Sequence, residues 1–153
     1  MVVIFIGDKK IKAKENIKKS LMTIIKYITI ETEEIFFIFG DEGKFCKICL
    51  ELVSEMKKDF PMFFRINVRE EYQYISNKYR KKIMQSYDYT CFPTKIRDIG
   101  GDIEIKRNEY LIDKADVCIF NYNEKKQDKK SGDVTGYAVS YAKRKSKEIF
   151  NIF

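Results

Sequence analysis

The sequence predicts an α/β fold in which a mainly parallel sheet lies between helices. Short continuous runs of β-branched and aromatic residues recur along the chain, and lysine-rich segments with apolar residues at helical spacing separate them. Glycines follow the ends of several of these runs. Continuous apolar runs are typical of strands that are buried on both faces of a parallel sheet, and their alternation with helices is typical of α/β domains.

The first 68 residues alternate between predicted strands and predicted helices. Apolar runs predict strands at Val2–Ile6, Ile35–Phe39 and Met62–Val68. Between them, apolar residues at helical spacing predict one helix over Ile11–Ile28 and a second over Phe45–Met56, each with one buried face. Such units join parallel strands by right-handed crossovers, so the three strands are expected in one sheet.

The second half of the chain continues this pattern less regularly. Its predicted elements are a helix at Ser76–Gln85, a short strand at Ile103–Ile105, a short helix at Arg107–Lys114, a strand at Val117–Phe120, a helix at Thr135–Arg144 and a strand at Glu148–Phe153. No repeat or second domain is visible. Residues 1–153 are therefore predicted to form a single Rossmann-like domain with a sheet of about five strands and helices on both faces.

The composition excludes several kinds of chemistry. The chain carries 30 Lys+Arg against 23 Asp+Glu, a net charge of +7, and no histidine. Without histidine there is no Ser-His-Asp or Cys-His catalysis and no His-ligated zinc. A basic surface suits nucleic acid, but the excess of lysine over arginine, together with abundant isoleucine, is typical of AT-rich codon usage, so nucleic acid is not the favoured partner.

The sequence also predicts a cytoplasmic protein that does not enter a membrane. No apolar run approaches the ~20 residues that span a bilayer, and the start of the chain lacks the features of a signal peptide. The four cysteines are scattered, which favours free thiols. Cys46 and Cys49 form a CxxC pair without the second pair that a structural zinc site needs, and no other cofactor or metal signature is present.

Five glycines follow predicted strands at what should be one edge of the sheet. They are Gly7 after the first strand, Gly40 and Gly43 after the second, and Gly132 and Gly136 after the strand at Val117–Phe120. Ligands of open parallel sheets bind at the carboxyl ends of the strands, where glycine allows close approach of the backbone. These turns could form a cradle for phosphate or sugar; the alternative is that tight turns simply require glycine.

The segment Ser131–Gly136 is the strongest candidate for an anion site. Ser131 or Thr135 can cap the following helix. Ala138 and Ala142 form a stripe of small residues that lets this helix lie close to the sheet and point its positive amino end at the edge.

Four blocks of the sequence together resemble the SLOG superfamily, a group of Rossmann-like domains named for the Smf/DprA DNA-processing proteins and the LOG phosphoribohydrolases. The blocks are Gly7-Asp8-Lys9, Gly40-Asp41-Glu42-Gly43, the segment from Arg107-Asn108 to Asp116, and Ser131-Gly132 with Thr135-Gly136. The resemblance covers nearly the whole chain and is greatest to short bacterial and phage members.

This resemblance implies a nucleotide or nucleotide-derived ligand. Its phosphate would lie at Ser131–Gly136, the first and second strand ends would complete the pocket, and Arg107 and Asn108 would contact the ligand. Arginine can pair bidentately with phosphate. The alternative for Arg107 is a surface ion pair with Glu104 or Asp113.

The chain departs from the pattern of the superfamily at its most polar positions. Relatives often have Gly-His-Arg in place of Gly7-Asp8-Lys9 and Gly-Asn-Gln-Gly in place of Gly40-Asp41-Glu42-Gly43, and Asp133-Val134 splits their Ser-Gly-Thr. The LOG enzymes resemble one another in a Pro-Gly-Gly-x-Gly-Thr-x-x-Glu loop. Ala138 stands where that catalytic glutamate is expected.

These features favour a binding domain, with a sensor or sequestering role, over an enzyme. One alternative is a nucleotide-processing hydrolase that uses Asp8, Asp41 or Glu42, which are otherwise solvated turn residues. Another is binding of single-stranded nucleic acid through basic runs such as Lys78–Lys82. Assembly into a homo-oligomer is left open.

Overall fold

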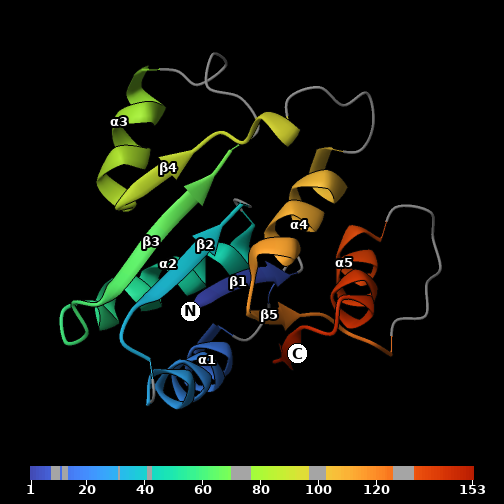
Figure 1. Ribbon diagram of the computed structural model, residues 1–153. Coiled ribbons are helices and arrows are strands. Elements are labelled where there is room, and N and C mark those ends of the chain that lie inside the picture. The colour runs from blue at the N-terminus through green and yellow to red at the C-terminus, as the bar shows by residue number, and fades with distance from the viewer. Residues whose placement is uncertain are drawn as a thin grey trace.

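The protein, seen in a computed structural model, has one sheet of six parallel strands with five helices (Figure 1). The structure describes residues 1–7, 11, 14–30, 32–40, 43–69, 77–96, 103–125 and 133–153. The strands are β1 (Val2–Gly7), β2 (Ile35–Phe39), β3 (Phe63–Val68), β4 (Tyr89–Cys91), β5 (Val117–Asn121) and β6 (Glu148–Asn151). The helices are α1 (Lys14–Thr29), α2 (Lys44–Met56), α3 (Asn77–Ser86), α4 (Ile103–Lys114) and α5 (Val134–Arg144), with a short 3-10 turn η1 (Thr94–Ile96).

The predicted α/β fold is thus confirmed, with six strands rather than about five. The strand predicted at Ile103–Ile105 is wrong, because these residues form the first turn of α4. The pattern Ile-Glu-Ile alternates like a strand, but it runs on into the helical spacing of Leu111 and Ile112, which are buried against the sheet. The edge strand β4 was not predicted, since three residues of mixed polarity carry no periodic signal.

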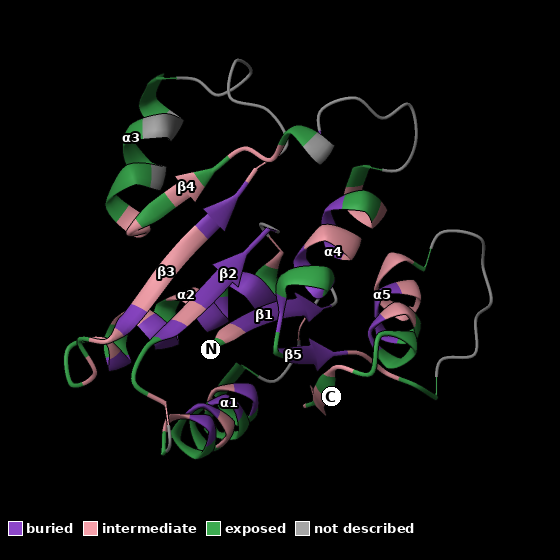
Figure 2. Cartoon of the chain, in the orientation of Figure 1, coloured by how far each residue is buried: buried purple, intermediate pink, exposed green. Residues whose placement is uncertain are grey.

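Helices cover both faces of the sheet and create two hydrophobic cores. On one face α1 and α2 pack on alternate strand residues, including Phe5, Phe37 and Phe63. On the other face α4 and α5 pack on the intervening residues, which include Ile4 and Phe120. Figure 2 shows that β1 and β5 are almost entirely buried, whereas β3 and β4 contain many half-buried or exposed residues. The sheet is therefore best covered at its centre.

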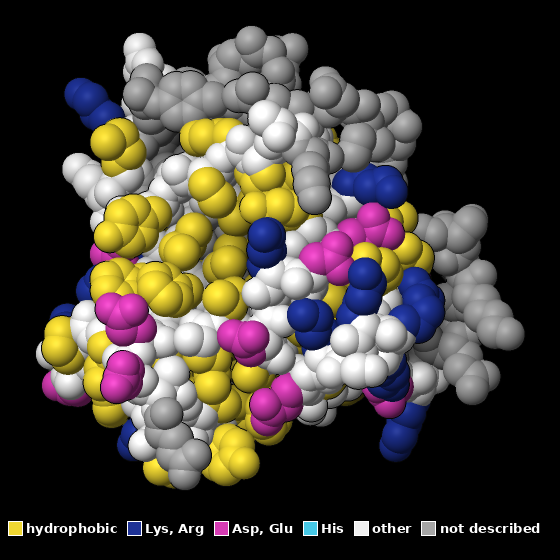
Figure 3. All heavy atoms as spheres, in the orientation of Figure 1, with side chains coloured by type: hydrophobic (Ala, Val, Ile, Leu, Met, Phe, Trp, Pro, Cys, Tyr) yellow, Lys and Arg dark blue, Asp and Glu magenta, His cyan; other side chains and the backbone are white. Residues whose placement is uncertain are grey.

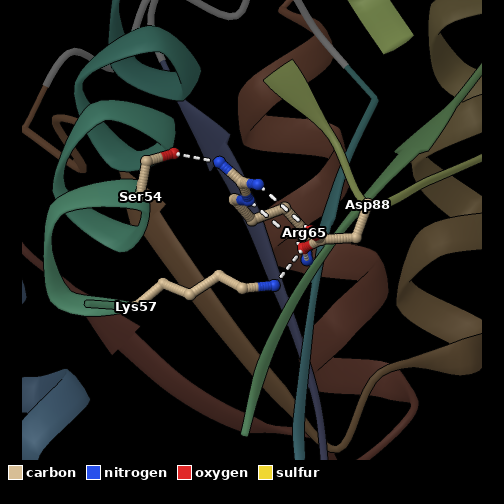
Figure 4. A network of polar contacts seen from close by, with 4 residues as sticks. All are labelled: Ser54, Lys57, Arg65 and Asp88. Atoms are coloured by element: carbon tan, nitrogen blue, oxygen red, sulfur yellow. Dashed lines mark hydrogen bonds and ion pairs between the residues drawn. The ribbon is translucent and has the colours of Figure 1, made fainter. Parts of the chain in front are cut away.

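A network of charged side chains joins the weakly covered end of the sheet to α2 (Figure 4). Arg65 on β3 donates hydrogen bonds to the carboxylate of Asp88, just before β4, and to the hydroxyl of Ser54 on α2. Lys57, after the end of α2, adds an ion pair of 2.8 Å with Asp88. This network fixes the start of the short strand β4, which has little hydrophobic burial of its own.

None of the helices in the described ranges is both long and apolar enough to cross a membrane.

Candidate functional site

The strand order β4-β3-β2-β1-β5-β6 locates the candidate site. The chain builds outward from β1 to β4, then returns past β1 to form β5 and β6. The direction of winding changes between β1 and β5, and open parallel sheets bind their ligands at the carboxyl ends of the strands at such a point. Gly7 and Asn121, which end these two strands, are direct neighbours in the register.

At Gly7 the space that a side chain would fill is taken by the core of the protein. A Cβ atom at this position would lie 2.5 Å from the ring of Phe45 and 3.0 Å from Cβ of Asn121. Phe45, the second residue of α2, is fully buried. Gly7 therefore lets the amino end of α2 approach β1, and its role in the structure is close packing of backbone and helix.

Gly40, directly after β2, has a similar role on the opposite face of the sheet. A Cβ atom there would lie 2.7 Å from Leu111 and 3.0 Å from Cδ of Arg107, both on α4. The side chain of Arg107 thus runs along the backbone at the end of β2, and the residue is only 7% exposed. Arg107 is therefore a buried residue of α4.

The amino end of α5 is capped by a carboxylate of the chain itself. Asp133 accepts a hydrogen bond of 2.9 Å from the backbone N–H of Gly136 and one of 2.6 Å from the hydroxyl of Tyr122. The cap is therefore Asp133, rather than Ser131 or Thr135 as expected from the sequence. As predicted, Ala138 and Ala142 are fully buried against the sheet. A negative group does occupy this helix terminus, and it comes from the protein.

The amino end of α2 differs from that of α5. Its cap residue is Gly43, which has no side chain that could accept a hydrogen bond from the first turn. The first helical residue is the exposed Lys44, and this turn contains no acidic residue. Because α2 follows β2, this helix end lies at the carboxyl edge of the sheet, where its partial positive charge favours an anion.

Buried polar side chains lie toward this edge on both faces of the sheet: Asn67 and Asn121 on the face of α1 and α2, and Arg107 of α4 on the other. Among the described residues, the buried polar or charged side chains are those of Asn67, Arg107, Asn108 and Asn121. Asn67 is the penultimate residue of β3 and Asn121 the last residue of β5. The sequence analysis predicts Arg107 and Asn108 as site residues but not the two strand asparagines. An asparagine at the end of an apolar strand is nevertheless a signal that could have indicated them.

Asn67 carries a buried donor whose acceptor is missing from the described structure. The residue is 3% exposed, and its Nδ2 has no hydrogen-bond partner among the described residues. Asn121 is better satisfied, since its Nδ2 lies 3.4 Å from the carbonyl of Ile152. Buried amide groups almost always have a partner, so Asn67 marks a position where a further polar atom fits.

Several residues predicted to form the site lie outside the described residues. They are Asp8, Lys9, Asp41, Glu42, Ser131 and Gly132, together with the basic run 126–130. The predicted residues that are described are Gly7, Gly40, Gly43, Arg107, Asn108, Thr135 and Gly136. Of these, Gly7 and Gly40 lie at the ends of the neighbouring strands β1 and β2, and Arg107 on α4 lies beside Gly40. Within the described ranges, no group of acidic residues and cysteines is arranged to hold a metal ion.

The CxxC pair belongs to the core. Cys46 and Cys49 are both free and buried, and the thiol of Cys46 lies 3.4 Å from the carbonyl of Phe5. Burial raises the pKa of Cys49 well above its usual value, and the neighbouring Cys46 raises it further. A thiol with a raised pKa is a poor nucleophile, so the prediction of packed thiols fits this geometry.

Comparison with known proteins adds no identification. No protein-family model matches the sequence, and no curated protein is significantly similar to it.

Proposed function

We propose that this protein binds a nucleotide or a nucleotide-derived small molecule at the carboxyl edge of its sheet. The observation that carries the proposal is the burial of polar side chains at the carboxyl ends of the strands: Asn67 near the end of β3, Asn121 at the end of β5, and Arg107 of α4 beside the end of β2. Buried amide and guanidinium groups at strand ends are suited to fix the polar edges and phosphates of such a ligand.

Within this proposal, the amino end of α2 supports a phosphate contact better than the amino end of α5. Asp133 already bonds to the N–H of Gly136, and its negative charge would repel a second anion. At the amino end of α2, the exposed Lys44 adds a positive charge, and the first turn contains no acidic residue. A phosphate at Ser131–Gly136, which the resemblance to the SLOG superfamily implies, remains the alternative position.

A binding role is favoured over catalysis because Ala138, fully buried on α5, stands where the superfamily pattern has a catalytic glutamate. Such a protein would act as a sensor of its ligand or would sequester it.

The test is a thermal-shift screen with nucleoside mono-, di- and triphosphates, cyclic nucleotides and nucleotide sugars. At a concentration one hundred times its Kd, a ligand stabilises the folded state by about 2.7 kcal/mol. For a chain of this length the melting temperature should then rise by roughly 5–10 °C. Native mass spectrometry of protein purified from its own host extends the search to ligands outside the panel.

Variants distinguish this site from nonspecific binding. Arg107→Lys keeps the positive charge but loses the bidentate geometry of the guanidinium, and Asn67→Leu removes the buried amide. Each variant should strongly reduce the ligand-induced rise in melting temperature. Circular dichroism checks that both variants are folded. Lys114→Gln, on an exposed position of the same helix, is the matched control. The proposal fails if no ligand shifts the melting temperature and none is retained. Release of free base or ribose phosphate would instead indicate a hydrolase.

A further inference from the structure

A row of aromatic side chains crosses three neighbouring strands at the β4 end of the sheet. Phe36 on β2 stacks on Phe64 of β3 with ring centroids 5.1 Å apart, and Phe64 lies 6.3 Å from the ring of Tyr89 on β4. Phe36 and Phe64 are half-buried, and Tyr89 is 59% exposed. None of the three belongs to either hydrophobic core or to the side chains packed against one.

The row lies on the face of the sheet that α4 and α5 cover only over its centre. Both helices make their main contacts to the sheet at β1. Figure 3 shows hydrophobic side chains gathered over β2, β3 and β4 on this face, to the left of α4. Within the described ranges, no helix packs on the three rings of the row.

The helix beside this row carries positive charge that nothing in the described structure neutralises. Lys78, Lys81 and Lys82 on α3 are exposed, and α3 contains no acidic residue. None of these three lysines forms an ion pair with another described residue. Lysines elsewhere do find carboxylates, as in the pairs Lys14–Glu51, Lys106–Glu109, Lys143–Glu124 and Lys145–Asp113.

The basic helix lies next to the strand that carries the last ring of the row. α3 ends three residues before Tyr89, and it contacts β4. Met84 on α3 is 68% exposed and adds a further apolar side chain to this helix. We call Phe36, Phe64, Tyr89, Met84 and the three α3 lysines the β4 surface.

We propose that the β4 surface docks an acidic segment of a partner protein that also carries apolar side chains. Protein interfaces combine aromatic and methionine side chains at the centre with charged groups at the rim, which is the composition of this surface. The lysines supply a positive rim that an acidic partner complements. β4 is also an edge strand, with β3 as its neighbour, so an extended segment can add to the sheet beside it.

The same observations disfavour other occupants. Bases stack on the open faces of aromatic rings, but Phe36 and Phe64 stack on each other, and Nζ of Lys57 lies over the Phe64 ring, 5.4 Å from its centroid. A second copy of the chain would bring another net charge of +7 to the contact. An apolar segment with negative charges fits both the rings and the lysines.

The experiment uses an array of 12-residue peptides with Asp or Glu at alternate positions and Phe, Leu, Ile or Val at the others. The charge-reversed array, with Lys in place of the acids, is the control. The affinity of the 153-residue chain for the selected acidic peptides is then measured by fluorescence anisotropy. We expect salt-dependent binding that weakens at least tenfold in Lys78→Gln/Lys81→Gln/Lys82→Gln and in Tyr89→Ser.

A matched variant removes the same charge elsewhere. Lys19→Gln/Lys26→Gln/Lys47→Gln changes three exposed lysines of α1 and α2 and should alter the affinity less than twofold. Equal weakening in both triple variants overturns the proposal, as does an array without selected acidic peptides. The proposal is also overturned if the β4 surface binds a thymidine dodecamer or anionic vesicles more tightly than it binds the acidic peptides. Self-association of the protein that is lost in Tyr89→Ser would likewise assign the surface to another occupant and overturn the proposal.

Discussion

The guanidinium of Arg65 holds the carboxylate of Asp88 through two nitrogen atoms: Nε lies 3.2 Å from Oδ2, and Nη2 lies 3.1 Å from Oδ1. The backbone N–H of Arg65 donates a third bond, of 2.8 Å, to Oδ2. The two side chains are only 18% and 21% exposed. One carboxylate therefore fixes the relation of β3 to β4.

Replacing this carboxylate should destabilise the fold. Asp88→Asn leaves the partly buried Arg65 and Lys57 without their anion, at an expected cost of about 2 kcal/mol in the free energy of unfolding. Urea denaturation measures the change. The control is Glu51→Gln, which removes an exposed pair with Lys14 and should cost less than about 1 kcal/mol. Similar losses in the two variants would contradict the importance of the Asp88 network.

The same network should make stability depend on pH. Burial alone would raise the pKa of Asp88, but the hydrogen bonds from Arg65 and Lys57 outweigh it and hold the pKa well below its usual value. A carboxyl group whose folded-state pKa is depressed stabilises the protein above its unfolded-state pKa, about 3.9, and this stabilisation is lost as the pH falls below that value. Unfolding free energies measured between pH 6 and 3 should therefore fall more steeply in the wild type than in Asp88→Asn.

A side chain at Gly7 should disturb the contact of α2 with β1. In Gly7→Ala the new Cβ would lie 2.5 Å from the ring of Phe45, so either the ring or the helix must shift. Overpacking of this kind costs about 2 kcal/mol. The double variant Gly7→Ala/Phe45→Leu should lose less stability than the sum of its single variants, as judged by a double-mutant cycle. Strict additivity would show that the two positions do not interact.

Removing the cap of α5 should both destabilise the helix and create affinity for anions. Asp133→Ala loses the bond to the N–H of Gly136, at a cost of about 1 kcal/mol, whereas Asp133→Ser retains a capping oxygen. Millimolar phosphate should raise the melting temperature of Asp133→Ala more than that of the wild type, because the helix terminus is then vacant. Equal shifts in the two proteins would mean that Asp133 does not occupy an anion position.

Thiol labelling should separate the four cysteines into two groups. Cys91 is exposed, whereas Cys46, Cys49 and Cys118 are buried. Burial raises the pKa of Cys118 to about 12, which leaves almost no thiolate at neutral pH. Ellman's reagent should label one equivalent in the native protein and four in urea, and Cys91→Ser should remove the native reaction. Rapid labelling of more than one thiol would contradict the buried placement.

The sequence predicts the core of this fold well because burial leaves a periodic signal. The runs around Phe5, Phe37 and Phe120 are apolar on both sides of the strand, and both sides are indeed covered. β4 escaped prediction because its position depends on Asp88 and Arg65, which are distant from each other in sequence. An ion pair between distant residues has no local pattern.

Part of the candidate site could be predicted from the sequence because some of its residues also leave a local signal. The glycines at strand ends were found because glycine is a local signal, and Gly7 and Gly40 do lie at the carboxyl edge. Their actual neighbours, Phe45 and Arg107, could not be predicted, because the packing of α2 and α4 on the sheet decides which side chain fills each space. The capping role of Asp133 was missed because three neighbouring residues could each have served.

The central place of β1 also has a consequence for synthesis. β1 is made before the other five described strands, and β2 can cover one of its edges early, but the opposite edge pairs with β5, which begins at Val117. Until most of the chain has emerged, a row of apolar side chains and unpaired backbone amides stays open to other molecules. Fragments that end before Val117 should therefore aggregate, and the nascent protein should depend on chaperones until β5 has been made.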